Sequence, residues 1–178
     1  MCDAERRNGE IIMNVTEYGE YIKKVIAALP GGAFLTTKKD GKVNTMTIGW
    51  GSFGFEWGMP TFEAMVRESR FSKIAMDEID EFTVTFPTGG DMKDALAYCG
   101  RVSGRDADKI ADCKLEIAPS HTLDTPIVKC KGIVIECKTV LRLPMNADAS
   151  SAEILGKWYA NGDLHTMYFG KVMDCYEI

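Results

Sequence analysis

The order of secondary-structure signals constrains the fold of this chain more than any other feature. Short β-rich segments recur along the chain, helical segments are few and mostly short, and the two do not alternate regularly. Parallel βαβ units need that regular alternation, so its absence favours antiparallel strands. We therefore expect a mainly β fold: a closed or partly closed antiparallel barrel with flanking helices packed outside.

The start of the chain predicts a lead-in followed by a helix. Residues 1–10 are charged and contain no apolar signal core, and we expect residues 1–13 to be a flexible lead-in and residues 14–178 to form a single domain. Asn14 and Glu17 form a capping-box pair, after which apolar residues recur at helical spacing. Pro30-Gly31-Gly32 then ends the helix.

The other elements are predicted from alternation, caps and turn residues. The turn Lys39-Asp40-Gly41-Lys42 joins a hairpin, because Asp-Gly suits the positive φ angles of such turns. Residues 49–58 contain too many glycines for a regular element. Strands are expected at 33–37, 43–50, 62–66, 82–86, 131–143 and 165–176, and short helices at 71–79, 91–98, 106–112 and from Ser150 or Ser151 to Tyr159.

Composition excludes several classes of function. The net charge of −5 argues against a nucleic-acid-binding protein, which needs a basic face. No apolar run is long enough to cross a bilayer, and without an export signal we expect a cytoplasmic protein that does not bind membranes. The six cysteines are irregularly spaced and include no CxxC pair, so free thiols are expected instead of a disulfide framework.

The sequence Gly49-Trp50-Gly51-Ser52-Phe53-Gly54 matches GxGxxG after a predicted strand. A dinucleotide-binding fingerprint must open a helix, so that the pyrophosphate meets the helix N-terminus. Here Met59-Pro60 and the residues before it indicate a turn, so a Rossmann fold is rejected. The glycine-rich aromatic segment still indicates backbone that approaches a flat ligand closely.

The segment Arg67–Lys73 is the best candidate anion site in the chain. It passes from the end of a strand into a short helix, where free backbone N–H groups and the positive end of the helix dipole meet. Serine hydroxyls and a guanidinium can add charge-assisted bonds to a phosphate. The alternative is that Ser69 or Ser72 only caps the helix and that the charges are solvated.

A second polar stretch runs from Cys99 to Lys109, with Gly100 and Gly104 permitting tight backbone. By itself, such a stretch is more often a surface loop than a site. Cys99 is either a small buried residue at a helix end or a thiol activated by nearby arginines. We favour the buried interpretation, because free cysteine is among the most buried residue types.

The sequence shows no self-sufficient catalytic group. The two histidines, His121 and His165, lie in no nucleophile motif; we expect the first in an exposed loop and the second in a structural role. A zinc site of Cys113, His121 and two more cysteines fits no known ligand spacing, so no metal is expected. This absence favours a cofactor that brings its own chemistry.

Three segments in order resemble the flavin reductase-like FMN-binding split-barrel family, in the subgroup that includes flavoredoxin. Residues 44–50 look like the family's N-x-M-T strand, and 67–72 are similar to its R-x-S-R-x-T/S turn. Residues 99–109 resemble the subgroup's C-G-x-x-S-G-R-x-x-D-K stretch, and 165–172 its closing strand. The resemblance spans nearly the whole chain, from about residue 15 to 178.

The resemblance implies FMN held at the edge of an antiparallel split β-barrel, near a homodimer interface. The residues expected to line the isoalloxazine are Thr47, Ile48, Gly49 and Trp50. Those expected to hold the phosphate are Ser52, Ser69, Arg70 and Ser72. Those expected to close over the flavin, or to come from the partner subunit, are Ser103, Gly104 and Lys109. The glycine-rich segment after Trp50, and Met59-Pro60 in place of a double proline, depart from the family's pattern.

These expectations lead to an FMN-binding oxidoreductase. The first hypothesis is a reductase that takes electrons from NADH or NADPH and passes them to free flavin or ferric iron. The second is a flavoredoxin-like electron carrier reduced by another redox protein, and the third is an FMN-binding module without turnover. A homodimer also follows from the apolar aromatic segment Trp50–Trp57, which is hard to leave in water on a monomer.

Overall fold

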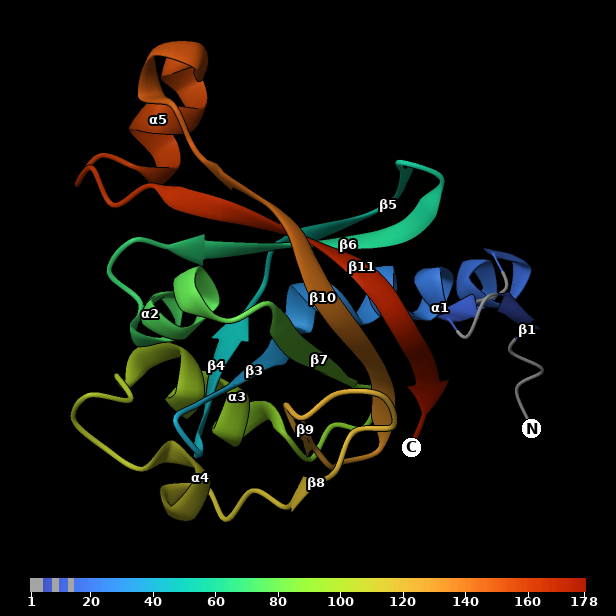
Figure 1. Cartoon of the computed structure of the whole chain (residues 1–178). Helices are drawn as coiled ribbons and strands as arrows, with labels where there is room; N and C mark the ends of the chain where they lie inside the picture. Colours follow the sequence, from blue (N-terminus) through green and yellow to red (C-terminus); the bar gives the residue numbers. More distant parts are fainter. Residues whose placement is uncertain (1–4, 8–9, 13–14) are drawn as a thin grey trace.

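The computed structural model describes residues 5–7, 10–12 and 15–178, with side chains from Tyr18 onward (Figure 1). The expected capping pair of Asn14 and Glu17, and much of the expected lead-in over residues 1–13, lie outside what is described. Within that stretch, two strands that the sequence did not predict, β1 (Glu5–Arg7) and β2 (Glu10–Ile12), pair antiparallel.

One seven-stranded antiparallel sheet forms the body of the described chain, in the order β4-β3-β7-β10-β11-β6-β5. The predicted hairpin turn is confirmed, with φ of 51° at Asp40 and 76° at Gly41. The strands are β3 (Ala33–Lys39), β4 (Lys42–Ile48), β5 (Gly51–Glu56), β6 (Met59–Arg67), β7 (Glu81–Pro87), β10 (Gly132–Pro144) and β11 (His165–Glu177).

The sheet curls without closing. Strands β10 and β11 are the longest, and register shifts at 136/137 and 139/141 interrupt their pairing. Such bulges bend a strand and increase its twist. The curl brings β4 beside β6, although the two strands are not hydrogen-bonded neighbours in the sheet. The expected antiparallel split barrel is confirmed.

The prediction for residues 49–58 was wrong, because β5 runs through them and pairs with β6. Their glycines serve close packing. A Cβ on Gly51 would lie 2.6 Å from the carbonyl oxygen of Glu63 and 2.9 Å from the Phe62 ring. The hairpin turns at Trp57 and Gly58, which both have positive φ.

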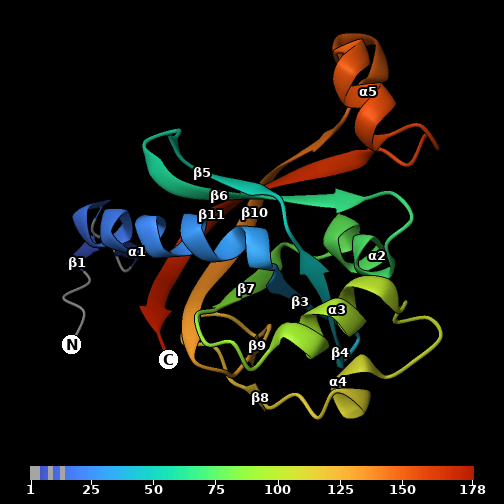
Figure 2. The ribbon, with the colours of Figure 1, turned by 180° about the vertical axis from the view of Figure 1, so that it is seen from behind.

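Helix α1 (Val15–Ala28) and the 3-10 turn η1 (Leu29–Gly31) lead into β3. Figure 2 shows α1 lying across the sheet, where it contacts β7 and β11. The buried hydroxyl of Tyr18 donates to the carbonyl of Thr61 at 2.6 Å, which fixes the helix to β6. The main core fills the space between this helix and the strands, with Phe62, Phe82 and Phe86 fully buried.

Three short helices pack on the β4 side of the barrel: α2 (Phe71–Glu78), α3 (Lys93–Arg101) and α4 (Lys109–Asp112). Helix α3 includes Gly100, which the sequence placed in a turn, and α4 begins at Lys109 instead of residue 106. The side chain of Asp108 caps α4 by accepting from two backbone N–H groups at 3.2 Å. These two bonds set the residue at which α4 begins.

Between β10 and β11 the chain forms an arm that projects from the barrel, consisting of η2 (Ala147–Ala149) and α5 (Ala152–Trp158) (Figure 1). The predicted helix there is confirmed, and Ser151 is its cap, accepting from the N–H of Ile154 at 3.3 Å. Strands β8 (Ile117–Ala118) and β9 (Ile127–Val128) form a small separate ladder. No helix among the described residues is long and apolar enough to cross a membrane.

Candidate functional site

Two adjoining cavities lie where β4, the end of β6 and the start of α2 meet. The first has a volume of about 180 Å³ and is lined by Met46, Thr47, Ile48, Gly49, Trp50, Met65, Arg67, Arg70 and His165. The second, of about 100 Å³, lies between α2 and the end of α3 and is lined by Met46, Ser69, Arg70, Phe71, Ser72, Cys99, Arg101, Val102, Ser103, Gly104, Arg105 and Lys109. Met46 and Arg70 belong to both, so the two cavities share a wall.

The first cavity contains all four residues that were expected to line a flavin ring. Gly49 leaves open space on its Cβ side, which allows a flat ligand to approach the backbone. The hydroxyl of Thr47 is not free, because it donates to the carbonyl of Leu96 on α3 at 2.7 Å. Thr47 can therefore offer a ligand mainly its backbone groups.

The ring of Trp50 and the guanidinium of Arg67 line this cavity, and both contact aromatic rings of the arm. The ring of Trp50 meets that of Trp158, from the arm, edge to face at 5.0 Å. Arg67 lies over the rings of Trp50 and Tyr159, at 5.9 and 5.0 Å. It also donates to the backbone carbonyls of Asp163, at 2.6 Å, and Trp158, at 3.1 Å, so the arm is tied to β6.

His165 begins β11 and also lines the first cavity, a role that the sequence did not reveal. Its side chain is buried, and its Nδ1 is 2.8 Å from the hydroxyl of Tyr159. Burial, followed by the nearby charge of Arg67, lowers the pKa of His165 to about 4. The imidazole is therefore neutral near pH 7.

The second cavity is rich in positive charge. Among the described residues, no carboxylate pairs with Arg70, Arg101, Arg105 or Lys109. Arg70 donates to the carbonyl of Gly100 at 2.6 Å, and Arg105 donates to that of Ser69 at 3.1 Å. Lys109 is only 4% exposed, and desolvation lowers the pKa of its ammonium group, with Arg70 contributing. An anion here would relieve this uncompensated charge.

The two serines of the predicted phosphate turn are positioned differently. Ser69 bonds to Asp163, through its backbone N–H at 3.0 Å and its hydroxyl at 2.7 Å. Ser72 is buried and accepts from the side-chain amide of Asn44 at 2.8 Å. Neither serine caps α2, because its N-cap residue is Arg70 and makes no side-chain cap bond. The alternative that these serines serve only as helix caps is therefore wrong.

The third predicted group, from the segment after α3, also reaches the second cavity. Ser103 accepts from the N–H of Arg105 at 3.2 Å and so shapes the turn. A Cβ on Gly104 would collide with the Asn44 side chain and lie 2.7 Å from the ring of Phe71. Glycine is required here by packing against β4 and α2.

Ser52 is the one predicted cofactor residue that lies apart from the rest. It is exposed on β5, its hydroxyl donates to the carboxylate of Glu63 at 2.7 Å, and it lines neither cavity. Met65 on β6 and Asp163 before β11 were not predicted from the sequence, because their positions depend on contacts between distant segments. Arg105, which lines the second cavity, could have been predicted from the sequence, because it directly follows Gly104 in a stretch already recognised as polar.

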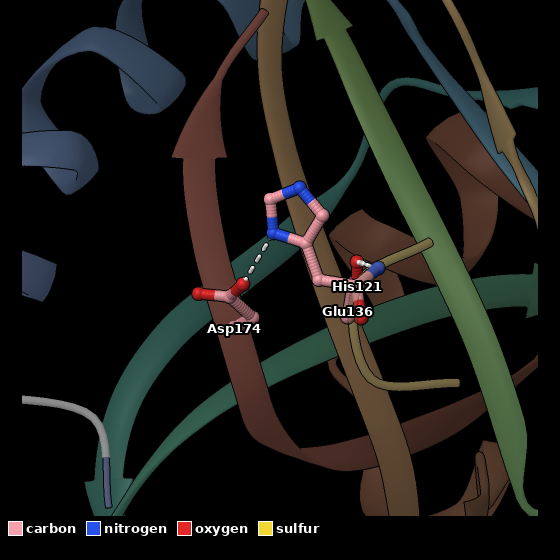
Figure 3. A group of neighbouring side chains, drawn as sticks. All are labelled: His121, Glu136 and Asp174. Carbon is pink, nitrogen blue, oxygen red and sulfur yellow. Dashed lines mark hydrogen bonds and ion pairs between the residues drawn. The ribbon is translucent and has the colours of Figure 1, made fainter. Parts of the chain in front are cut away.

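Outside these cavities, His121, Glu136 and Asp174 group together closely enough to suggest a metal site (Figure 3). Both oxygens of buried Glu136 are already used. One accepts from the N–H of His121 and the hydroxyl of Tyr176, and the other from the N–H and hydroxyl of Thr122. With its acceptor capacity filled, Glu136 has no lone pair to offer, so the group holds the loop in place.

His121 lies in a loop with an exposed side chain, as expected, but its imidazole contacts two residues of β11. Its Nδ1 is 2.8 Å from a carboxylate oxygen of Asp174, and its ring stacks on Tyr176 with centroids 3.7 Å apart. Both contacts attach the loop to β11, which supports a structural role.

Comparisons with known proteins agree with this architecture. The model of the flavin reductase-like domain matches residues 28–178. Flavoredoxin from Methanosarcina acetivorans is 26% identical, with a TM-score of 0.64 over 83% of this chain and 68% of that one. An FMN-binding protein from Thermus thermophilus is 21% identical (TM-score 0.64; 82% and 69% covered). The 2-nitrobenzoate 2-nitroreductase of Pseudomonas fluorescens is 18% identical (TM-score 0.63; 94% and 73% covered).

No curated protein sequence matches the chain. The family model covers far more than half of it, from the last residue of α1 to the C-terminal Ile178, and includes every residue of both cavities. The chain therefore belongs to the flavin reductase-like domain family, with flavoredoxin-type relatives.

Proposed function

We propose that this protein is an FMN-dependent oxidoreductase. The observation that carries the proposal is the adjacency of the two cavities, the first lined by residues 47–50 with the ring of Trp50 and the second by uncompensated cations, with Arg70 between them. A flavin mononucleotide has a flat ring and a terminal phosphate, which match this pair of environments. The residues proposed to hold it are Thr47, Ile48, Gly49, Trp50, Ser69, Arg70, Ser72, Ser103, Gly104 and Lys109.

When bound, FMN supplies the redox chemistry, since it accepts and releases electrons one or two at a time. The protein's own part is electrostatic. Arg67 and Arg70 line the first cavity, where their positive charge would favour a flavin ring that gains negative charge on reduction. His165 is held by Tyr159 and stays neutral, so it offers a hydrogen-bonding nitrogen without adding charge.

Binding of FMN in preference to riboflavin tests the phosphate assignment. The two ligands share the ring and differ in the phosphate, so a titration of the apoprotein with each isolates the second cavity. We expect FMN to bind at least about tenfold more tightly, the effect of one charge-assisted hydrogen bond. Equal affinities would contradict the proposal that the second cavity holds a phosphate.

We favour a reductase that uses NADH or NADPH to reduce free flavin or ferric iron. Solved structures similar to this chain include a nitroreductase and an NADH:FAD oxidoreductase from Streptomyces globisporus, and these two enzymes support turnover. They also include two flavoredoxins, which support the alternative of an electron carrier reduced by another redox protein.

Stopped-flow bleaching of the flavin distinguishes these alternatives. A reductase bleaches within the instrument's time range with NADH or NADPH, whereas a carrier bleaches only with a reduced redox protein such as ferredoxin. A protein that binds FMN and is reduced by neither is a binding module without turnover.

We further propose a homodimer, formed through the outer face of β6, β11 and β10. Leu141 pairs with Phe169, and Leu143 with Met167, so these side chains share one face. Leu141 and Leu143 are 37% and 45% exposed, and Trp57, 62% exposed, lies against Phe169. An apolar face of this kind usually marks an interface. Met65, which lines the first cavity, pairs with Met167, so the interface would adjoin the flavin site.

A further inference from the structure

Cys99 and Cys113 form a pair of thiols beside the second cavity. Cys99 is fully buried near the end of α3, and half-buried Cys113 directly follows α4. Cys99 belongs to the buried apolar cluster under α3, and Cys113 packs against the same cluster. The residues that precede the two cysteines connect the two segments, because the hydroxyl of Tyr98 donates to the carboxylate of Asp112 at 2.6 Å.

The position of the pair along the chain connects it to the proposed flavin site. The segment between the two cysteines carries Ser103, Gly104 and Lys109, which line the second cavity together with Cys99 itself. Lys109 also lies 3.5 Å from the backbone carbonyl of Cys99. A covalent bond between the cysteines would therefore join both ends of the segment that closes this cavity.

The two thiols differ in accessibility, and the thiol of Cys99 is poorly acidic. Burial, then the neighbouring Cys113, raises the pKa of Cys99 to about 12, so the activation by arginines considered from the sequence is not present. Cys113 is the more accessible of the two. Of the pair, Cys113 would meet an oxidant from solvent first, and Cys99, in the cluster against which Cys113 packs, can then react with the product.

We propose that Cys99 and Cys113 form a reversible disulfide that locks the flavin-closing segment. A peroxide oxidises the Cys113 thiol to a sulfenic acid and is itself reduced, releasing water in the case of hydrogen peroxide. The sulfur of Cys99 then attacks the sulfenic sulfur, forming the S–S bond, while the sulfenic oxygen leaves with the Cys99 proton as a second water. Two thiols are oxidised by two electrons, and a dithiol reductant restores them.

The consequence for the cofactor rests on the proposed FMN function. A cross-link that ties the two ends of the closing segment removes conformations in which this segment opens, and preorganisation of this kind tightens binding. Release of FMN from the oxidised protein is expected to be about two- to tenfold slower than from the reduced protein.

Peptide mapping of the full chain tests the cross-link. The FMN-bound protein is treated with stoichiometric hydrogen peroxide, remaining thiols are alkylated, and the digest is examined by mass spectrometry. We expect a peptide that links Cys99 to Cys113 and disappears after dithiothreitol. Accumulation of Cys113 as sulfinic acid with Cys99 still alkylated would overturn the proposal.

Matched variants separate the cross-link from general oxidation. Cys113→Ser removes the accessible thiol of the pair and should abolish both the linked peptide and the slower FMN release. Cys130→Ser changes a buried cysteine outside the pair and should leave both intact. Cys99→Ala removes the other thiol of the pair and should likewise abolish the linked peptide and the slower FMN release.

Release of FMN on dilution, followed by the fluorescence of free flavin, tests the functional consequence. Equal release rates before and after oxidation, with the linked peptide present, would overturn the locking role. A chain that forms the linked peptide but does not bind FMN would instead refute the proposed function and leave the disulfide standing.

Discussion

The carboxylate of Asp163 accepts two hydrogen bonds from Ser69, one from the backbone N–H at 3.0 Å and one from the hydroxyl at 2.7 Å. Ser69 lies two residues before the first residue of α2, and Asp163 lies at the base of the arm. This contact fixes the arm against the start of the helix that carries the anion site. It also means that Ser69 already has an anionic partner, so a bound phosphate would have to share or displace it.

Replacing Asp163 with alanine should loosen the arm. Without its carboxylate, Ser69 loses its partner and the Trp158 ring loses support against Trp50. We expect faster amide hydrogen exchange in α5 and weaker Trp50–Trp158 coupling in the near-UV circular dichroism spectrum. Asp148→Ala, which changes an exposed acidic residue on the same arm, is the control. Unchanged exchange in α5 would show that the carboxylate does not hold the arm.

Replacing Arg70 with alanine should weaken FMN binding by about ten- to a hundredfold, since an ion-assisted hydrogen bond contributes roughly 1.5–3 kcal/mol. The loss should be much smaller for riboflavin, because Arg70 is proposed to act on the phosphate. Equilibrium titrations with both ligands measure the difference, and Lys23→Ala, on the exposed face of α1, is the control. Normal FMN binding by Arg70→Ala would make Arg70 an ordinary structural charge.

Replacing Gly104 with alanine should destabilise the fold by about 1–3 kcal/mol, the usual cost of overpacking. The added Cβ would collide with the Asn44 side chain and with the ring of Phe71, which lines the anion cavity. Gly156→Ala is the matched control, because its Cβ meets nothing within 4 Å and it lies in a helix. That change should stabilise the protein by about 0.5–1 kcal/mol. Urea unfolding of both variants measures the contrast, and equal stabilities would contradict it.

The stability contributed by keeping His165 neutral should depend on pH. Its pKa falls from 6.5 to about 4 on folding, so between these values the unfolded chain binds a proton that the native protein does not. Stability from this group is complete above about pH 6.5 and is lost as the pH falls through about 4. We compare wild type with His165→Asn, which retains a partner for Tyr159. The wild-type advantage in unfolding free energy should shrink from pH 7 to pH 4.5; a constant difference would contradict the shifted pKa.

Charge placed on the outer apolar face should prevent dimer formation. Leu141→Lys introduces a cation beside Phe169, and burying it in an interface would cost more than the leucine contributes. We expect wild type to run as a dimer in light scattering at micromolar concentration and the variant as a folded monomer. Val140→Lys, at the adjacent exposed bulge position, is the control for added charge. A monomeric wild type with FMN bound would contradict the dimer.

The sequence alone determined the elements of this protein whose signals are local. Asp40-Gly41 predicted the hairpin because the turn needs positive φ angles, and Ser151 marked the start of α5 because its side chain caps the first turn. Strand alternation and the lack of βαβ units determined the antiparallel class. The basic serine turn before α2 indicated an anion site, although it did not show which groups were free to bind.

Tertiary structure decided what those groups contact. Ser69 is engaged by Asp163, 94 residues away, and Ser52 faces Glu63 outside both cavities; neither relation follows from local sequence. The glycines of residues 49–58 suggested irregular backbone, but Gly51 is needed because Phe62 and Glu63 pack against it within a regular strand. His165 reached the cavity through the register of β11 with β6. Strand register and cross-barrel packing depend on residues distant in the chain, and these long-range contacts decide which local signals become a site.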